Sequence, residues 1–489
     1  METLQTSLPP GLVPTLRAAL GAPFVLTDPA ELRVYDCDGL TGWRATPACV
    51  VLPGSSDEVR AVVRACHDAR VPWVVRGAGT GLSGGSLPVA GGIVISVSRM
   101  NRILEIDLAG QRVVVEPGVA NLDVTKAVSG DGFFYAPDPS SQQVCTIGGN
   151  VAENSGGAHC LKNGFTVTHV TGLSVVLPDG ELVTLGDKAL DPDGPDLLAL
   201  FIGSEGTLGI AVEITLRIVC RPETVVTQLA AFHTIDGAGE AVSRIIASGM
   251  SPAAIEMMDA LTIDAAEQAF RPGYPAGAGA VLLVELDGVR AQVEPDAAAV
   301  DEICRACGAF EVRVAESEQE RARLWLGRKA AFPAVGRISP DYYVQDGVVP
   351  RTKLPEVLRR IAEIGERHGL RVGNVFHAGD GNLHPLVLYD AAKGEAELAK
   401  TVAEEILTAC IDAGGALSGE HGIGVDKACS MPQMFSARDL EAFGRVRRAF
   451  DPAGLANPGK VLPTPRLCGE NPGPYRRHAL EEAGVAHRL

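Results

Sequence analysis

Three histidines and a glutamate in the last quarter of the chain are the residues best suited to chemistry. His377 and His384 bracket the sequence Ala-Gly-Asp-Gly-Asn-Leu, while Glu420 and His421 lie together between two glycines. A Gly-Asp-Gly-Asn tetrapeptide between apolar β-like runs favours a tight hairpin, so we expect His377 and His384 to face each other across paired strands. Imidazole is the commonest protein ligand of transition metals, and Glu420 would complete a set of two histidines and one carboxylate. Such a set leaves one coordination position open, and it leaves His421 available for proton transfer.

These residues alone leave two other interpretations open. His377 and His384 could be core histidines of a purely structural hairpin, since histidine is often partly buried. The same three ligands could also hold a zinc ion that activates water in a hydrolase. Other parts of the chain must decide between these interpretations.

A second group of residues, rich in glycine, lies in the N-terminal third. In segment 76–85, Gly79, Gly81 and Gly84 match the spacing of a dinucleotide-binding fingerprint. That fingerprint must open a helix, whereas this segment runs into a proline, more glycines and a β-branched strand. We therefore expect a loop whose backbone N–H groups surround a pyrophosphate, with a flexible surface loop as the alternative.

Further glycine clusters indicate that one large ligand is contacted by several loops. They lie at 137–141, 148–157, 203–209 and 457–460. A ligand with the length of FAD would require that many contacts. The residues that we predict to bind this cofactor are Arg76, Gly77, Ala78, Gly79, Thr80, Gly81, Ser83, Gly84, Pro137, Ser141, Gly148, Gly149, Asn154, Gly156, Gly157, Glu205, Gly206, Gly209, Ile210 and Asn457.

Length and composition bound the remaining possibilities. The chain has 489 residues, 46% of them hydrophobic, which is enough for about three domains. Its net charge of -17 argues against binding to nucleic acid or directly to a bilayer. We find no secretory signal and no apolar run near the roughly 20 residues that span a membrane. The 11 scattered cysteines suggest reduced thiols without an iron–sulfur motif, and we expect a cytoplasmic protein.

The elements that must position these residues change in character along the chain. Strands at 48–52 and 71–75 flank a helix at 57–69, and three more strands follow the first glycine loop. After residue 221, longer amphipathic helices alternate with strands, which predicts helices packed on one sheet. A final helix is expected at 437–450.

Together these segments resemble one family over almost the whole chain, from Pro47 to Pro463. The family is the FAD-linked D-2-hydroxyacid dehydrogenases, a branch of the vanillyl-alcohol-oxidase flavoproteins with a PCMH-type FAD domain. The resemblance implies an α+β fold with a two-part PCMH-type FAD-binding domain and an α+β cap domain that carries an antiparallel sheet. The implied divisions are an N-terminal helical extension (1–42), the FAD-binding domain (43–222), the cap, substrate and metal-binding domain (223–430), a C-terminal helical segment that returns to the flavin (431–465) and a tail (466–489).

The resemblance also implies the roles of the site residues. A divalent metal (zinc, iron or manganese) would be held by His377, His384 and Glu420. His421 would be the base that takes the hydroxyl proton while the C2 hydride moves to flavin N5. Arg328, which follows a tryptophan, would bind the substrate carboxylate.

Departures from the family pattern favour a small substrate. Members that act on longer dicarboxylates have a lysine near 342–346 and an asparagine where this chain has Leu386. We therefore expect glycolate or D-lactate, with D-2-hydroxyglutarate as the alternative. The step from His384 to Pro385 resembles most closely the glycolate-oxidase type.

Electron transfer from the flavin is expected to need a partner. The chain has no iron–sulfur motif and no nicotinamide site, so electrons would pass to flavin and iron–sulfur partner subunits or to a quinone-linked carrier. Attachment to the inner membrane would then come only through such partners. A flavin-bearing electron-transfer subunit without turnover is the alternative, although the full ligand set argues against it.

The FAD is expected to be bound without a covalent link. Segment 76–92 contains no histidine or cysteine that could attach it. His159 and Cys160 lie just after Gly157 and keep covalent attachment open as an alternative.

Overall fold

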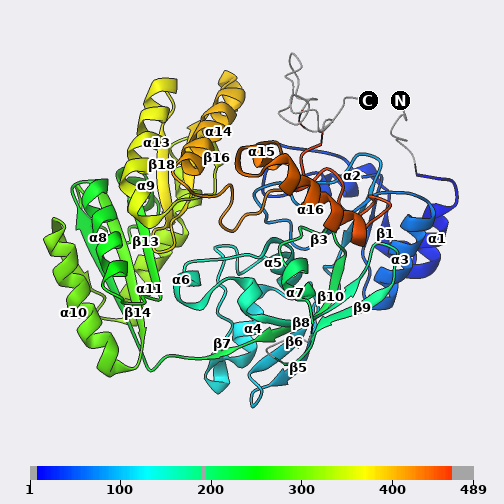
Figure 1. Cartoon of the computed structure of the whole chain (residues 1–489), viewed down its shortest axis with the longest axis horizontal. Helices are drawn as coiled ribbons and strands as arrows, with labels where there is room; N and C mark the ends of the chain where they lie inside the picture. Colours follow the sequence, from blue (N-terminus) through cyan, green and yellow to red (C-terminus); the bar gives the residue numbers. More distant parts are fainter. Residues whose placement is uncertain (1–7, 190–193, 465–467, 469–489) are drawn as a thin grey trace. The chain divides into compact units, whose positions relative to one another are not determined.

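The protein, described by a computed structural model over residues 8–189, 194–464 and 468, divides into two compact units (Figure 1). Unit 1 contains the described residues of 1–155, 165–220 and 421–489. Unit 2 contains residues 156–164 and 221–420. The chain therefore enters unit 2 twice.

The first sheet of unit 1 is a small, mainly parallel one. Its strands are ordered β1 (Val25–Leu26), β2 (Cys49–Val51), β4 (Ile93–Ser96) and β3 (Trp73–Arg76). Helix α3 (Ser56–Asp68) connects β2 to β3. The Ser55 hydroxyl caps this helix by accepting a hydrogen bond from the amide of Glu58, 3.2 Å away. The predicted strand–helix–strand start is confirmed.

The second sheet of unit 1 is antiparallel and carries most of the glycine-rich segments between its strands. The order is β5 (Ile103–Asp107), β6 (Arg112–Val115), β10 (Ile210–Arg217), β8 (Val170–Val176) and β9 (Leu182–Gly186). A two-stranded pair, β7 (Phe133–Phe134) with β11 (Val219–Cys220), lies outside it. The helices of unit 1 include α1 (Leu12–Leu20), α4 (Asn121–Val128), α5 (Ile147–Glu153), α7 (Leu197–Phe201), α15 (Met431–Met434) and α16 (Ala437–Phe450).

Unit 2 is built on one antiparallel sheet of nine strands. Along the sheet the strands run β15 (Ala309–Val314), β12 (Thr224–Phe232), β14 (Ala280–Gly288), β13 (Ala254–Asp259), β18 (Val372–His377), β19 (Asn382–Leu383) and β17 (Gly347–Val348). Strand β20 (Pro385–Tyr389) pairs with β18 and with β16 (Asp341–Val344).

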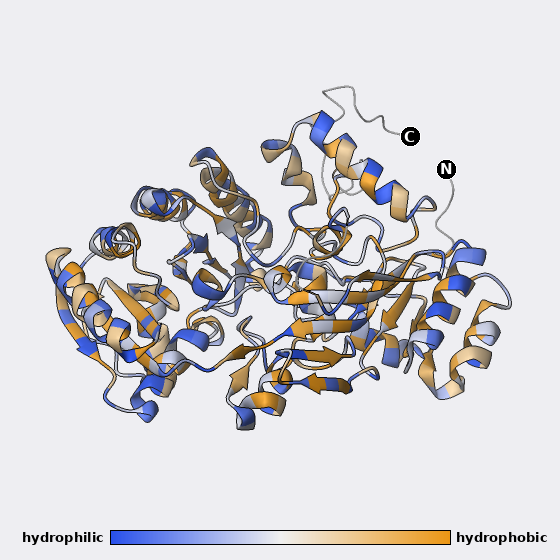
Figure 2. Ribbon diagram, turned by 60° about the horizontal axis from the view of Figure 1, so that its bottom comes forward, coloured by the Kyte–Doolittle hydropathy of each residue, from blue (hydrophilic) through white to orange (hydrophobic). Residues whose placement is uncertain are grey.

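Helices cover both faces of this sheet, so its central strands are buried on both faces and largely apolar rather than alternating (Figure 2). Leu282 packs into a core with α8 (Ile235–Ala247), α10 (Arg290–Ala306), α13 (Leu354–His368) and α14 (Ala396–Asp412). The next residue, Leu283, packs on the other face with α9 (Ala260–Phe270), α11 (Glu318–Lys329) and α12 (Ala331–Val335). The expected helices on a sheet therefore form two layers, one on each face.

Several sequence-based expectations need correction. The sequence analysis did not predict β13, α9 or α14. The cluster Gly148–Gly149, which we expected in a loop, lies in the first turn of α5, where the Thr146 side chain caps the helix. Cys429 and Cys468 form a disulfide, so the expectation of reduced thiols is wrong for this pair, whose partners lie 39 residues apart. The predicted domain bounds stay a prediction.

Within the described ranges, none of the helices has the length and apolar character that a bilayer span requires. The other nine cysteines form no disulfide among the described residues, and six of them are buried. These six are placed as core residues.

Removing side-chain volume from the sheet of unit 2 should destabilise the protein. Leu282 is fully buried, so Leu282→Ala should lower the free energy of unfolding by about 2–5 kcal/mol through lost burial and a cavity. Leu182→Ala is the matched control because Leu182, on β9, is 45% exposed. Urea unfolding followed by circular dichroism measures both, and equal effects of the two substitutions would contradict the assignment of this core.

Candidate functional site

The predicted hairpin between His377 and His384 forms, with a register that brings the two rings together on one face. His377 pairs with Asn382, and Asn374 pairs with Pro385. This common register sets His384 diagonally across from His377, two positions along the neighbouring strand. The ring centroids lie 5.2 Å apart and the rings are nearly perpendicular. The hairpin is confirmed, although the two histidines are diagonal rather than directly opposite.

Both imidazoles of the hairpin converge on Glu420. Nε2 of His377 and Nε2 of His384 each lie 3.3 Å from Oε1 of Glu420. One nitrogen or oxygen from each residue lies within 4.8 Å of the others, and both histidines are buried. Two aromatic nitrogens and a carboxylate oxygen that converge in this way are a suitable donor set for a divalent transition metal.

The charges at these three residues depend on one another. Burial lowers the pKa of His377, but the carboxylates of Glu256 and Glu420 outweigh this effect and hold it well above its ordinary value. The pKa of His384 is likewise raised, because Asp346 and Glu420 outweigh burial. Burial raises the pKa of Glu420, yet the two histidines keep it well below its usual range. The buried carboxylate thus requires positive charge, which protonated rings or a bound cation can supply.

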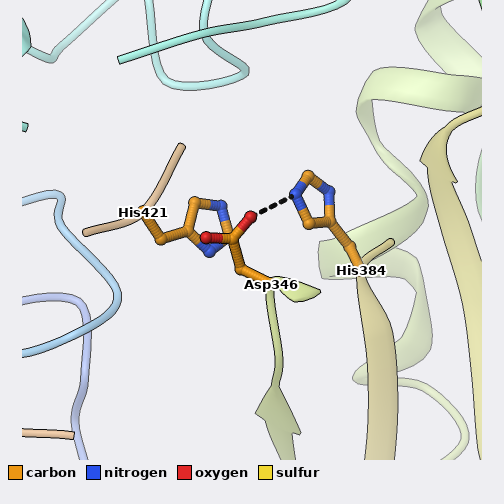
Figure 3. Close-up of side chains that lie close together, drawn as sticks. All are labelled: Asp346, His384 and His421. Atoms are coloured by element: carbon orange, nitrogen blue, oxygen red, sulfur yellow. Dashed lines mark ion pairs between the residues drawn. The ribbon is translucent and has the colours of Figure 1, made fainter. Parts of the chain in front are cut away.

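Asp346 fixes the main chain that presents Glu420. Its carboxylate accepts hydrogen bonds from the Ser418 hydroxyl at 2.5 Å, the Gly419 amide at 3.0 Å and the Glu420 amide at 3.3 Å. Oδ1 of Asp346 also lies 3.4 Å from Nε2 of His384, the ion pair drawn in Figure 3. Asp346 is fully buried just after β16, so this loop is held from inside the unit.

Arg328, which we predicted to bind the carboxylate of the substrate, lies next to the carboxylate of Glu256. The guanidinium is buried on α11, and its Nη2 lies 2.6 Å from Oε2 of Glu256. Nε of Arg328 is buried and has no hydrogen-bond partner within the described ranges. Arg328 therefore forms one ion pair, with Glu256, and has a further buried N–H group that could donate to the carboxylate of a substrate.

In unit 1, the first glycine loop packs directly against other backbone. After β3, residues 77–92 form neither helix nor strand, which confirms that the fingerprint opens no helix. A Cβ on Gly77 would lie 2.2 Å from the Thr146 hydroxyl, so the loop and the start of α5 need glycine there. Ser83 O accepts a hydrogen bond from the amide of Val425, 3.0 Å away. The loop therefore contacts both α5 and the segment that follows His421.

Asn457 and Glu205 join three of the predicted cofactor segments. The Asn457 side-chain amide donates to the backbone oxygens of Gly85 at 2.8 Å and Glu205 at 2.6 Å. The Glu205 carboxylate accepts from the amides of Ile423 and Gly424, both at 2.7 Å. Burial raises the pKa of Glu205 above its ordinary value. The two amides and two nearby lysines lower it, but by less than burial raises it. Glu205 thus supports the main chain after His421.

Two of the predicted cofactor residues are assigned to the second compact unit. Gly156 and Gly157 belong to unit 2, together with α6 (Cys160–Asn163). In that unit Nε2 of His159 lies 3.0 Å from Oε1 of Glu285. The other predicted cofactor residues, and His421, belong to unit 1.

Family models match both parts of the sequence. The description "FAD binding domain" matches residues 47–186, and "FAD linked oxidases, C-terminal domain" matches residues 221–461. Glycolate oxidase subunit GlcD of Escherichia coli (strain K12) is 50% identical over 447 residues, which are 91% of this chain and 90% of that protein. The chain belongs to the FAD-linked oxidases. It is therefore a flavoprotein oxidoreductase whose cofactor is FAD.

Other members of the FAD-linked oxidases agree with this assignment. Glycolate oxidase subunit GlcD of Bacillus subtilis (strain 168) is 40% identical over 88% of this chain and 92% of that protein. A D-lactate dehydrogenase of Anaerostipes hadrus is 33% identical over 86% of this chain and 90% of that protein.

Solved structures share the fold of this FAD-linked oxidase at low sequence identity. A p-cresol methylhydroxylase structure has a TM-score of 0.79 and 17% identity, and the match covers 93% of this chain and 97% of that one. A 4-ethylphenol oxidase from Gulosibacter chungangensis has a TM-score of 0.78 and 21% identity, covering 93% and 99%. These similarities confirm the PCMH-type fold.

Glu256 and Asp346 are the site residues that the sequence analysis missed. Glu256 lies on β13, a strand that was not predicted, where it is a single charge within the apolar run 253–258. A lone acid in a fully buried strand is the signal that could have identified it. Asp346 ends the run after β16, and nothing in its spacing connects it to Glu420.

Lys460, which follows the Asn457 turn, should make stability depend on pH. It is buried and donates to the backbone oxygen of Leu87 at 2.8 Å. Burial lowers its pKa from 10.5 to about 8, although Asp38 and Glu205 raise it. Above that pKa the native state has released a proton that the unfolded chain still binds, so stability should rise with pH up to about pH 10.5.

The comparison of the wild type with Lys460→Met isolates this effect. The wild-type free energy of unfolding, minus that of the variant, should rise by at most about 1.4 kcal/mol per pH unit over this window. Urea unfolding at pH 7.0, 8.5 and 9.5 measures it. A difference that stays constant across these pH values would show that burial does not lower the pKa of Lys460.

Proposed function

We propose that this FAD-linked oxidase converts a small D-2-hydroxy acid, glycolate or D-lactate, into the corresponding 2-oxo acid. The observation that carries the proposal is the convergence of His377 Nε2 and His384 Nε2 on one oxygen of Glu420. This donor set suits a divalent metal (zinc, iron or manganese) with a position left open for substrate. The names of the relatives, glycolate oxidase subunit and D-lactate dehydrogenase, support the substrate class.

Different residues of the chain bind the substrate and take its proton in this proposal. A divalent cation held by His377, His384 and Glu420 would supply charge that polarises the substrate hydroxyl and lowers its pKa, and the flavin would supply the acceptor for the C2 hydride at N5. A ring nitrogen of His421 takes the hydroxyl proton, so the substrate loses a hydride and a proton in total and becomes the oxo acid. Arg328 binds the substrate carboxylate through its buried N–H groups.

The environment of Leu386 supports a short substrate. Leu386 is fully buried on β20, where it pairs with Val344 and with Gly373. An apolar side chain at this position offers no hydrogen bond to a second carboxylate, which would be costly to bury without one. A D-2-hydroxyglutarate-type dehydrogenase, whose substrate has a second carboxylate, is for this reason only the second candidate.

In this proposal the reduced flavin transfers its electrons to a partner subunit or to a quinone-linked acceptor. Two relatives are named as subunits, which supports an assembly with flavin and iron–sulfur partners or a quinone-linked acceptor. The proposal includes a cytoplasmic location, with contact to the inner membrane only through these partners. It also includes dissociable FAD, because Nε2 of His159 already lies against Glu285.

Substrate should bleach the flavin only when metal is present. Under anaerobic conditions, glycolate or D-lactate should reduce the visible absorbance of the purified protein, and chelator treatment should abolish this reduction. Added zinc or manganese should restore it. A protein that bleaches equally well after its metal has been removed and verified absent would contradict the metal-assisted reaction.

The proton-transfer role of His421 has a separate test. His421→Ala should reduce the rate constant of flavin reduction by about 10²- to 10⁴-fold, because general-base catalysis contributes that much. Stopped-flow absorbance measures the rate, and FAD and metal contents should remain those of the wild type. His67 lies on α3, and His67→Ala is the control: its flavin should be reduced at the wild-type rate. Full-rate reduction in His421→Ala would exclude this base.

A further inference from the structure

A line of buried charged groups extends behind His377. Glu256 lies on β13 directly opposite His377 on β18 in the antiparallel pairing. Its two carboxylate oxygens lie 2.8 Å and 3.0 Å from Nδ1 of His377. On its other side, Oε2 lies 2.6 Å from Nη2 of Arg328. The side chains of Glu256 and Arg328 are 1% and 3% exposed, so water does not separate them from their partners.

This arrangement determines which nitrogen of His377 can bind a metal. A carboxylate accepts hydrogen bonds but cannot donate them, so Nδ1 of His377 must carry the proton. Nε2 lies 3.3 Å from Oε1 of Glu420, and its proton is the one that a bound metal would replace. The strand register therefore holds the proton on Nδ1 and leaves Nε2 as the nitrogen that can bind a metal.

Arg328 allows Glu256 to keep its charge in this buried position. An ionised carboxylate without a partner is strongly disfavoured inside a protein, whereas one beside a guanidinium is compensated. Arg328 can only donate, so it accepts no proton from Glu256 and leaves the carboxylate as an acceptor for Nδ1. The pair Glu256–Arg328 thus acts on the ring of His377 through Nδ1.

We propose that Glu256, compensated by Arg328, is a positioning residue that fixes His377 as an Nε2 ligand of the divalent metal. This inference rests on the metal site of the proposed function. Glu256 lies behind the ring of His377, whereas the three ligand atoms converge on the opposite side of it. Its contribution is to metal affinity and ligand geometry.

A matched control lies on the neighbouring strand. Glu285 on β14 is also buried and also contacts a histidine and an arginine, with His159 at 3.0 Å and Arg321 at 2.9 Å. No interaction described for its carboxylate involves any of the three proposed ligands. Glu285→Gln therefore removes an equivalent buried charge without acting on His377.

The test measures metal binding to the full chain with FAD bound. Metal is removed with a chelator, and zinc is then titrated against a chromophoric chelator. In Glu256→Gln, Arg328 takes the amide oxygen and turns the NH₂ group toward Nδ1, which favours the wrong tautomer. Zinc affinity should fall about 10- to 100-fold, the usual effect of losing such a supporting partner. Glu285→Gln should bind zinc as the wild type does.

A second variant and a spectrum complete the test. Glu256→Asp keeps the charge beside Arg328 but is one methylene too short to hold Nδ1, so it should also weaken zinc binding at least about 10-fold. Cobalt substitution should give a different visible ligand-field spectrum in either Glu256 variant. Flavin content and thermal unfolding report whether each variant is folded, and Glu256→Asp serves if Glu256→Gln does not fold.

The outcomes separate this inference from the proposed function. A wild type that binds no zinc would overturn the metal site itself. A wild type that binds zinc, together with folded Glu256 variants of unchanged affinity and cobalt spectrum, would overturn only the role of Glu256. Equal weakening in Glu285→Gln would also overturn it, because the effect would then be general to buried charge on this sheet.

Discussion

A buried carboxylate must have hydrogen-bond donors or a cation beside it, and this constraint organises the candidate site in unit 2. Glu256 has His377 and Arg328, while Asp346 has the main chain of the loop that carries Glu420. In Glu420, one carboxylate oxygen lies 3.3 Å from Nε2 of His377 and 3.3 Å from Nε2 of His384. Each of the three acids therefore has donors or rings beside it, and a divalent cation bound as proposed would replace ring protons at Glu420.

In unit 1, buried backbone amides likewise need hydrogen-bond acceptors. The glycine loop and the segment after His421 approach so closely that a Cβ on Gly424 would lie 1.8 Å from the oxygen of Ser83. At such contact there is no room for water, so the exposed amides need a protein acceptor. Glu205 provides it through both carboxylate oxygens. Glu205, which we predicted as a cofactor contact, therefore also holds the segment after His421 in place.

The sequence predicted those features that depend on local chemistry. The hairpin of His377 and His384, the cap at Ser55 and the non-helical glycine loop follow from turn and capping preferences, which act over a few residues. Glu256 could not be found in this way. Its role depends on the pairing of β13 with β18, more than one hundred residues apart, and a fully buried strand has no alternating pattern to reveal it. The error at Gly148 had a different, local cause, because the cap at Thr146 outweighed the low helix propensity of glycine.

The order of Glu420 and His421 in the chain has a structural consequence. One is a proposed ligand and the other the proposed base, and they are consecutive residues at the point where the chain passes from unit 2 to unit 1. The amides up to Glu420 are held by Asp346 within unit 2, and those from Ile423 are held by Glu205 within unit 1. Only a short stretch of main chain, which includes one glycine, remains between these two anchors. Each proposed functional residue therefore has a buried acid of its own unit that holds the main chain beside it.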